Sequence, residues 1–403
     1  MTEIVTTPEG VPVIPTDPFT SENLSAPHAL HEQLREAGPV VYLERYKVWG
    51  MARYEQVNAA LKDWKTFSSA AGVGLSDFRK EKPWRPPSLL LEADPPAHTL
   101  AREVAGPVLS PRALDAVRGQ FEREAIALVD HLATLDSFDS VTQLAQVYAL
   151  KVFGDAVGLP VEGREHLLAY GDLAFNAFGP RNQLLATSMQ NAQGVQEWIA
   201  ENCRREVLRP DGFGAQIWEA AEKSKAPTEW AALLVRSLLT AGIDTTVNGI
   251  VAALYALATH PDQWQLLHED PSLAAQAFEE ALRWESPVQT FFRTTTRQVE
   301  IAGKIIPEGE KVLLFLGAAN RDPHRWPDPN RFDINRNASG HVAFGMGIHR
   351  CIGLTVARVE ADVLLTTLAR RAARIEITGQ PQRRPNNTLF AWKSLPLTIR
   401  SLA

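Results

Sequence analysis

Apolar residues three and four positions apart recur along most of the chain, and this is the pattern of helices that bury one face. The spacing predicts helices over residues 111–135, 141–158, 185–206, 228–259, 261–285 and 355–375. Together these segments make up the bulk of the expected fold.

Strand patterns are fewer. Residues 40–54 are rich in β-branched and aromatic side chains, residues 299–315 predict strands broken at two turn segments, and a hairpin is expected over 389–399. No stretch of the sequence has the composition of a linker between domains. We therefore expect one mainly α domain over residues 17–403, with a minor antiparallel β-sheet.

Composition and charge narrow the class of protein. Hydrophobic residues make up 45% of the chain and charged residues 22%, which is typical of globular proteins. The net charge of −6 argues against an obligate nucleic-acid binder. The longest apolar stretch, residues 249–258, is about half of the ~20 residues that cross a bilayer. We expect no membrane span and a cytoplasmic enzyme.

The N-terminal residues 1–16 contain several Pro and Thr residues and lack the basic start and apolar core of a signal peptide. We expect them to form a flexible tail. The chain has two cysteines, which excludes a disulfide scaffold and a four-cysteine metal cluster.

One cysteine lies in a glycine-rich segment, Phe-Gly-Met-Gly-Ile-His-Arg-Cys-Ile-Gly over 344–353, which is followed by a helical pattern. A position just before a helix favours the thiolate of Cys351, and a thiolate can ligate iron. The alternative is a buried structural cysteine in a glycine-rich turn. We interpret Cys203, which has no glycine nearby, as such a buried structural cysteine.

A polar sequence, Ala-Gly-Ile-Asp-Thr-Thr over 241–246, interrupts an otherwise apolar helix. Gly242 and adjacent Thr residues lower helix stability. A carboxylate such as Asp244 in an apolar run lowers the stability of the fold unless it has a partner, and it is then retained for a function. Departures of this kind often mark functional positions. The alternative is a Thr245 hydroxyl bonded to its own helix carbonyl, with Asp244 at the surface.

The pattern Phe-Gly-x-Gly-x-His-x-Cys-x-Gly resembles the haem-binding segment of the cytochrome P-450 monooxygenases, and the resemblance extends over nearly the whole chain from about Asp17. It implies the cytochrome P-450 fold, a haem b cofactor and O2 as co-substrate. Cys351 would be the axial ligand of the haem iron, with Phe344 near the sulfur. Asp244 and Thr245 would be the catalytic pair that delivers protons, and Gly242 would leave room for dioxygen.

Other residues match supporting motifs of the same family. Glu280 and Arg283 resemble its structural Glu-x-x-Arg pair, and Arg331 resembles the third member of that cluster. In isolation a Glu and an Arg three apart on a helix form an exposed ion pair. Haem propionates require several cationic or donor groups. The residues that the resemblance implies at the haem are His98, Arg102, Arg293, His349 and Gly353.

The substrate is suggested by one helix face. Ser237, Ala241 and Thr245 are spaced four apart, and a rise of about 1.5 Å per residue puts Ser237 roughly 12 Å from Thr245. An anion held at the far end would lie about one aromatic ring from the oxygen site, which suits a para-substituted benzoate.

The segments around this face closely resemble the bacterial P-450 subfamily that oxidises para-substituted benzoates such as 4-methoxybenzoate. The resemblance implies a carboxylate site made of Arg85, Ser88 and Ser237, with Arg236 close by. It implies a wall around the aromatic ring made of Leu90, Leu91, Phe175, Phe178, Ala241, Val288 and Phe291. The alternative for the two arginines is ordinary surface charge.

The sequence thus predicts oxidation of an aromatic acid, either as O-demethylation or as hydroxylation of a para-alkyl group. No flavin or iron–sulfur segment is evident, so a ferredoxin with its NAD(P)H-dependent reductase is the expected electron donor. Two alternatives stay open: the same chemistry on a neutral phenol, terpene or fatty acid, and a haem sensor or carrier without turnover. Arg350, Phe390 and Trp392 depart from the subfamily pattern and leave the pocket shape and the redox partner undetermined.

Overall fold

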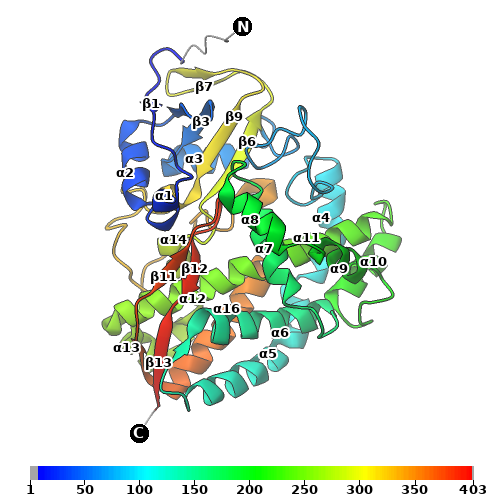
Figure 1. The fold of residues 1–403 in the computed structure, drawn as a ribbon, viewed down its shortest axis with the longest axis vertical. Coiled ribbons are helices and arrows are strands. Elements are labelled where there is room, and N and C mark those ends of the chain that lie inside the picture. Colours follow the sequence, from blue (N-terminus) through cyan, green and yellow to red (C-terminus); the bar gives the residue numbers. More distant parts are fainter. Residues whose placement is uncertain (1–7, 402–403) are drawn as a thin grey trace.

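The computed structural model describes residues 8–401. Helices form the larger, lower part of the molecule, and a sheet with the N-terminal helices forms the upper part (Figure 1). The helices are α1 (Ser21–Ser25), α2 (His28–Ala37), α3 (Tyr54–Lys62), α4 (Ala97–Val108), α5 (Pro111–Leu132), α6 (Gln146–Val157), α7 (His166–Asn176), α8 (Gln183–Asn191), α9 (Val195–Asn202), α10 (Phe213–Glu222), α11 (Trp230–Ala241), α12 (Asp244–Thr259), α13 (Pro261–Glu269), α14 (Ala274–Glu285), α15 (Leu316–Ala319) and α16 (Leu354–Arg371). Short π and 3-10 turns are η1 (Ser140–Ala145), η2 (Pro271–Leu273) and η3 (Gly347–His349). The mainly α fold is confirmed.

Three of the predicted helices are interrupted. The segment 261–285 forms α13 and α14, with the 3-10 turn η2 between them. The segment 185–206 forms α8 and α9, and the break is at Gly194, whose positive φ of 80° ends the helical path between them. The segment 228–259 forms α11 and α12, separated by Gly242 and Ile243. Periodicity therefore located the helices correctly but did not show where tertiary packing divides them.

The minor sheet is present, and its largest part is mixed rather than antiparallel. The strands are β1 (Val13–Ile14), β2 (Val41–Leu43), β3 (Val48–Met51), β4 (Phe67–Ser68), β5 (Phe138–Asp139), β6 (Thr290–Thr295), β7 (Val299–Ile301), β8 (Lys304–Ile306), β9 (Lys311–Phe315), β10 (Ala372–Ile377), β11 (Gln382–Arg384), β12 (Ala391–Ser394) and β13 (Pro396–Ser401). The main sheet has the order β1-β2-β3-β9-β6-β4, and β1 with β2 and β3 with β9 are parallel pairs. Part of the expected flexible tail, Val13–Ile14, lies in this sheet, whereas residues 1–7 lie outside the described part.

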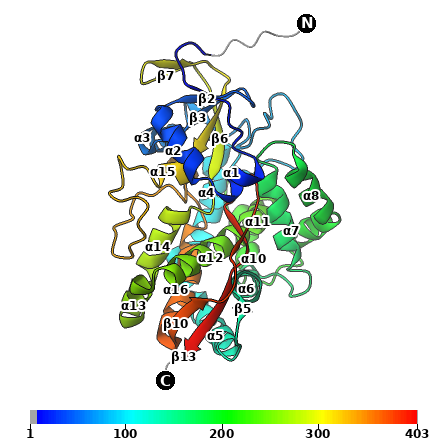
Figure 2. The ribbon, with the colours of Figure 1, turned by 60° about the vertical axis from the view of Figure 1, so that its left-hand side comes forward.

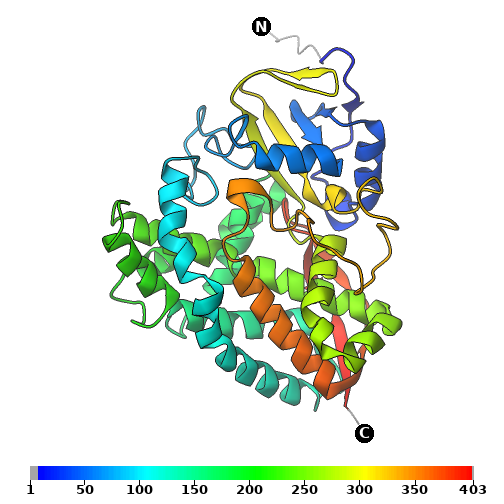
Figure 3. The same cartoon turned by 180° about the vertical axis from the view of Figure 1, so that it is seen from behind.

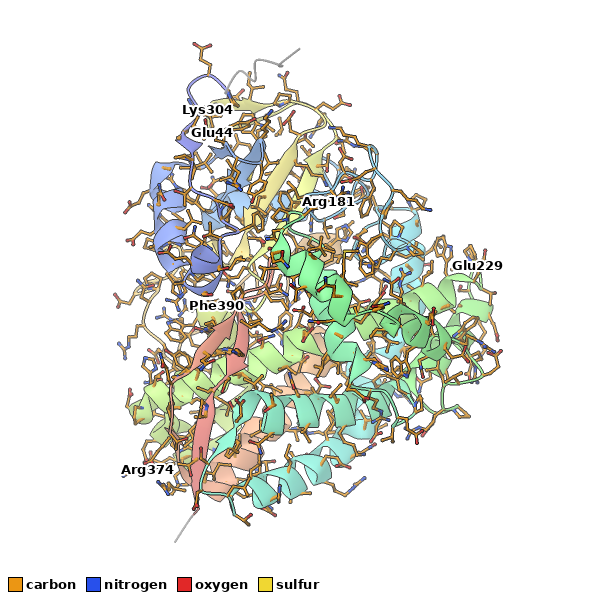
Figure 4. The ribbon with its side chains drawn as sticks, in the orientation of Figure 1. Glu44, Arg181, Glu229, Lys304, Arg374 and Phe390 are labelled. Carbon is orange, nitrogen blue, oxygen red and sulfur yellow. The ribbon has the colours of Figure 1, made fainter. Side chains whose placement is uncertain are left out.

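The predicted hairpin over 389–399 is wrong. Its two halves are strands, but β12 pairs with β11, and β13 pairs with β10 and β5. The single residue Leu395 separates them, and it is too short a connection for a two-residue hairpin turn. Phe390, labelled in Figure 4, lies just before β12, with its ring 5.8 Å from that of His28 on α2.

The helical core surrounds α12, which crosses the middle of the lower part (Figures 1 and 2). Seen from behind, α16 runs alongside α5 (Figure 3), and these two helices share the largest helix–helix contact in the described chain. The segment Trp230–Thr259 is long and apolar enough to cross a membrane, but 72% of its most apolar window is buried inside the protein. This is the property of a core helix of a soluble protein.

A buried ion cluster ties α14 to the segment that precedes the cysteine loop. Arg283 donates two hydrogen bonds of 2.7 Å to Glu280, and both side chains are fully inaccessible. The prediction that Arg331 completes this cluster is wrong, because its side chain is 65% exposed and lies near Asp333. The third member is Arg336, whose Nε lies 3.1 Å from Glu280 Oε1.

Candidate functional site

A large cavity lies between the cysteine loop, the α11–α12 junction and the segment 85–91. Its empty volume is about 1560 Å³, which includes its opening to solvent. The predicted site residues that line it are Arg85, Ser88, Leu90, Leu91, Arg102, Phe175, Phe178, Ser237, Ala241, Thr245, Val288, Phe291, Arg293, Phe344, His349, Cys351 and Gly353. The fold thus brings segments that are far apart in sequence to one chamber.

Three predicted residues, His98, Arg236 and Asp244, lie behind the lining rather than in it. His98 packs against His349, with ring centroids 4.4 Å apart. Sequence reasoning missed Phe153 and Thr246, which do line the cavity. Their helices were predicted, but nothing in a helical pattern distinguishes a residue that faces a cavity from one that faces the core.

The cysteine loop takes its shape from glycine. Gly345 and Gly347 have φ values of 66° and 67°, in the left-handed region that favours glycine. A Cβ on Gly347 would also lie 2.7 Å from the carbonyl oxygen of Leu61. The backbone N–H of Cys351 donates to the carbonyl of Phe344 at 2.8 Å, which closes the loop just before α16 begins at Leu354.

The thiol of Cys351 is accessible from the cavity but enclosed by protein on its other sides. Burial raises its pKa, and this effect exceeds the opposing effect of the backbone N–H groups of Gly353 and Leu354 and of the charges of Arg102 and Arg350. The predicted effect of the helix terminus is therefore present but not dominant. A bound metal cation deprotonates a coordinating thiol outright.

Buried guanidinium and imidazole groups gather near the cysteine loop. Burial lowers the pKa of Arg293 to about 10, and its Nη1 donates to the carbonyl of Phe292 at 2.8 Å. Within the described chain, Nε2 of His98 has no hydrogen-bond partner, and Nε2 of His349 has none within 3.5 Å, its nearest carboxylate oxygen being Asp94 Oδ1 at 3.6 Å. Buried donors of this kind require acceptors, and a dianionic cofactor such as haem b supplies them. These residues, together with Arg102 and Cys351, fit that cofactor.

The long helix is interrupted where the oxygen site was predicted. The hydroxyl of Thr245 faces the cavity and donates to the carbonyl of Ala241 at 2.7 Å, as in the alternative interpretation of this threonine. Gly242 lines the cavity, and its role of leaving room for dioxygen stays a prediction. A Cβ at Gly242 would lie 2.1 Å from the ring of Phe153, so glycine is needed for that ring to pack.

Asp244 is buried, with 4% of its surface exposed, which excludes the alternative that it lies at the surface. Its Oδ2 has no hydrogen-bond partner among the described residues, and it lies so close to Gly171 that a Cβ there would be 2.2 Å away. Burial raises the pKa of Asp244 from 3.8 to about 7. The carboxyl group can therefore both hold and release a proton near neutral pH.

This raised pKa predicts how stability depends on pH. The unfolded chain loses the Asp244 proton near pH 4 and the folded chain near pH 7, so wild type loses stability between these values. The loss is at most about 4 kcal/mol. Asp244→Asn carries no charge and should escape it, so its melting temperature relative to wild type should be higher at pH 8 than at pH 5.

Thermal unfolding of both proteins at the two pH values measures this difference. Asp115→Asn, at an exposed position on α5, is the matched control and should follow wild type. A constant difference between Asp244→Asn and wild type across this range would show that Asp244 is already ionised below pH 5 in the folded protein.

The far end of the cavity carries the predicted carboxylate site. Ser88 and Ser237 are joined by a hydrogen bond of 2.9 Å between their hydroxyls. Ser237 donates to the carbonyl of Leu233 at 2.9 Å, so Ser88 is the donor in the pair and its proton can be redirected to a ligand. Arg85 is 8% exposed and lines the cavity, unlike an ordinary surface arginine.

Arg236 has a different position from the one expected. Its Nη2 donates to the carbonyl of Pro86 at 2.7 Å, and its side chain supports the backbone that carries Arg85 and Ser88. Glu92 was missed by sequence reasoning. Its Oε2 lies 3.1 Å from Nη1 of Arg85, and a glutamate in a loop of mixed composition gave no signal of this contact.

The residues that depart from the subfamily pattern separate into two groups. Phe390 and Trp392 lie outside the cavity lining, where the guanidinium of Arg383 stacks 3.6 and 3.4 Å from their ring centroids. Arg350 does line the cavity, beside Cys351, and is also exposed at the surface.

Comparison with known proteins agrees with this geometry. The family model described as Cytochrome P450 matches residues 216–400. Cytochrome p450 CYP199A2 of Rhodopseudomonas palustris is 56% identical over 400 residues, which cover 98% of this chain and 97% of that protein.

Two solved structures extend the likeness to the whole fold. The structure of cytochrome P450 CYP109Q5 from Chondromyces apiculatus has a TM-score of 0.80 and 32% identity, over 97% of this chain and 99% of that one. Cytochrome P450 CREJ in complex with (4-ethylphenyl) dihydrogen phosphate has a TM-score of 0.85 and 26% identity, over 95% and 99% of the two chains.

Proposed function

The chain belongs to the cytochrome P450 family of monooxygenases, which use haem b and O2, and on this premise we propose that it oxidises the para substituent of benzoic acids. For a methoxy group the product is the phenol, because the hydroxylated methyl carbon leaves as formaldehyde. For a para-alkyl group the product is the alcohol.

The observation that carries this proposal is the position of Arg85 in the cavity. Arg85, Ser88 and Ser237 line the end that lies two helical turns from Thr245, and apolar side chains line the space between. The eight residues from Ser237 to Thr245 cross the junction of α11 and α12, and at the helical rise they span roughly 12 Å, about the length of one substituted aromatic ring. A ligand with an anion at one end and its reacting group at the other fits this arrangement.

A solved relative gives independent support for the ligand shape. Cytochrome P450 CREJ is described in complex with (4-ethylphenyl) dihydrogen phosphate, a para-substituted aromatic compound with an anionic group opposite the alkyl group. The same division into an anionic end and a para substituent is proposed for the ligand of this chain.

The two ends of the cavity have different roles in this proposal. Arg85 and Ser88 bind the carboxylate, and Phe175, Phe178 and Phe291, whose rings pack edge to face in series, orient the aromatic ring and exclude water. This fixes which carbon of the substrate lies at the reacting position.

At the other end, Cys351 would ligate the haem, and His98, Arg102, Arg293 and His349 would hold its propionates. When bound, haem b supplies the activation of dioxygen. The Thr245 hydroxyl donates a proton into the cavity, and Asp244, buried behind it with a pKa of about 7, resupplies that proton.

Electrons come from separate proteins in this proposal. We assign a ferredoxin and its NAD(P)H-dependent reductase as the donors and the cytoplasm as the compartment. Arg350, exposed beside Cys351, is a candidate contact for an acidic ferredoxin surface.

Regioselectivity tests the proposal. The reconstituted enzyme should release formaldehyde from 4-methoxybenzoate and at least about tenfold less from 3-methoxybenzoate, because a fixed carboxylate and a rigid ring move the meta carbon away from the reacting position. Product analysis with both acids at equal electron supply gives the ratio. Equal yields from the two isomers would mean that the carboxylate is not held, and a neutral substrate would then explain the cavity better.

A further inference from the structure

A buried carboxylate lies directly behind the anion end of the cavity. Glu92 Oε2 is 3.1 Å from Nη1 of Arg85, and it accepts a hydrogen bond of 2.8 Å from the backbone N–H of Ser88. The two charged side chains are only 7% and 4% exposed. Arg85 and Ser88 line the cavity and Glu92 does not, so this carboxylate acts on a ligand through its neighbours.

The charges at this end do not cancel. The guanidinium groups of Arg85 and Arg236 are both buried, and Glu92 neutralises one of them. The Nε atoms of both arginines have no hydrogen-bond partner among the described residues. Since buried charge is tolerated when it is paired and costly when it is not, this end lacks one negative charge.

We propose that Glu92 is a specificity-determining residue that restricts the anion end of the cavity to monoanionic aromatic ligands. The inference rests on the proposed function, because it takes Arg85 as the group that receives the ligand's anion. A carboxylate or sulfate supplies the one missing charge. A phosphate dianion brings a second negative charge that faces Glu92 across the same guanidinium and finds no cation of its own.

Glu92→Gln separates charge from shape. Glutamine keeps the length of the side chain and a carbonyl oxygen for the Ser88 N–H, and it removes the negative charge. The variant should therefore keep the turn at 88–92 and admit the dianion.

Two ligands of similar shape provide the test. 4-Methoxyphenyl sulfate and 4-methoxyphenyl phosphate both carry tetrahedral head groups, and at about pH 8, above the second phosphate pKa of ~6, they differ by one charge. Each is titrated into the ferric holoenzyme, wild type and Glu92→Gln, and the Soret band reports binding. 4-Methoxybenzoate is titrated alongside.

We expect wild type to bind the sulfate about tenfold or more tightly than the phosphate, and Glu92→Gln to shift that ratio about tenfold or more towards the phosphate. Glu81→Gln is the matched control, since Glu81 pairs with Arg181 (labelled in Figure 4) in the same part of the chain and does not contact Arg85. It should keep the wild-type ratio.

A ratio that is the same in wild type and Glu92→Gln overturns the inference, and so does a phosphate that binds neither protein. If Glu92→Gln does not take up haem, the two affinities of the wild-type protein are compared instead. A tenfold preference for the sulfate over the phosphate supports the inference, and equal affinities for the two ligands overturn it. If both proteins bind 4-methoxybenzoate and the sulfate-to-phosphate ratio is unchanged in Glu92→Gln, only the role of Glu92 is rejected and the proposed function stands. If wild type does not bind 4-methoxybenzoate, the proposed function itself fails.

Discussion

Replacing Cys351 by histidine should abolish the red-shifted absorption band that the reduced, carbon monoxide-bound protein owes to thiolate ligation. Cys351 is the cysteine at the cavity wall, and its loop is closed by the hydrogen bond to the Phe344 carbonyl and by two glycines with positive φ. Imidazole is a neutral ligand that donates less electron density to the iron than a thiolate does. Monooxygenase turnover should be lost together with the band.

Cys203 offers the control. It is 3% exposed in the helical core, outside the cavity lining, and burial raises the pKa of its thiol to about 12, so it stays neutral. Cys203→Ala should keep the red-shifted band. Retention of the band in Cys351→His, or its loss in Cys203→Ala, would assign the iron ligand to another residue.

Thr245→Ala should keep substrate affinity and divert electrons from product into hydrogen peroxide. The hydroxyl of Thr245 is a donor at the cavity wall, and in the described state it donates to the carbonyl of Ala241, from which it can rotate. Positioned proton donors contribute about 10²–10⁴ to catalysis, so product formed per electron should fall by about tenfold or more.

Product and peroxide are measured together against NAD(P)H consumed, with Thr245→Ser as the control that keeps the hydroxyl. The serine variant should remain close to wild type in product per electron. Unchanged product per electron in Thr245→Ala would remove Thr245 from proton delivery and leave its bond to Ala241 as a structural feature.

Local sequence patterns determined much of the architecture. Apolar spacing located the long helices because each buries one face, and the glycine-rich cysteine segment was recognisable because its backbone geometry needs glycine at 345 and 347. The need for glycine at 242 was not predictable in this way, since the ring that leaves no space for a side chain there, Phe153, lies about ninety residues earlier in the chain. Contacts of that kind are absent from any local pattern.

In the candidate site too, some features were predictable from local motifs and others were not. Motifs identified the residues that line the cavity, but they did not distinguish the partner of Glu280, where Arg336 rather than Arg331 turns inward. They also did not reveal that Arg236 supports the backbone at Pro86 or that Glu92 pairs with Arg85. Which of several charged residues in a loop turns inward is decided by the path of the backbone through the folded protein.

The substrate class is tested most directly by titrating the ferric protein with 4-methoxybenzoate and with its methyl ester while following the Soret band. If Arg85 and Ser88 hold a carboxylate, the ester leaves these buried donors without a charged partner, at a cost of about 1.5–3 kcal/mol. The acid should then bind roughly ten- to a hundredfold more tightly than the ester, and Arg85→Ala should remove the difference. If the ester binds as well as the acid, or if Arg85→Ala leaves binding of the acid unchanged, the substrate is not a benzoate.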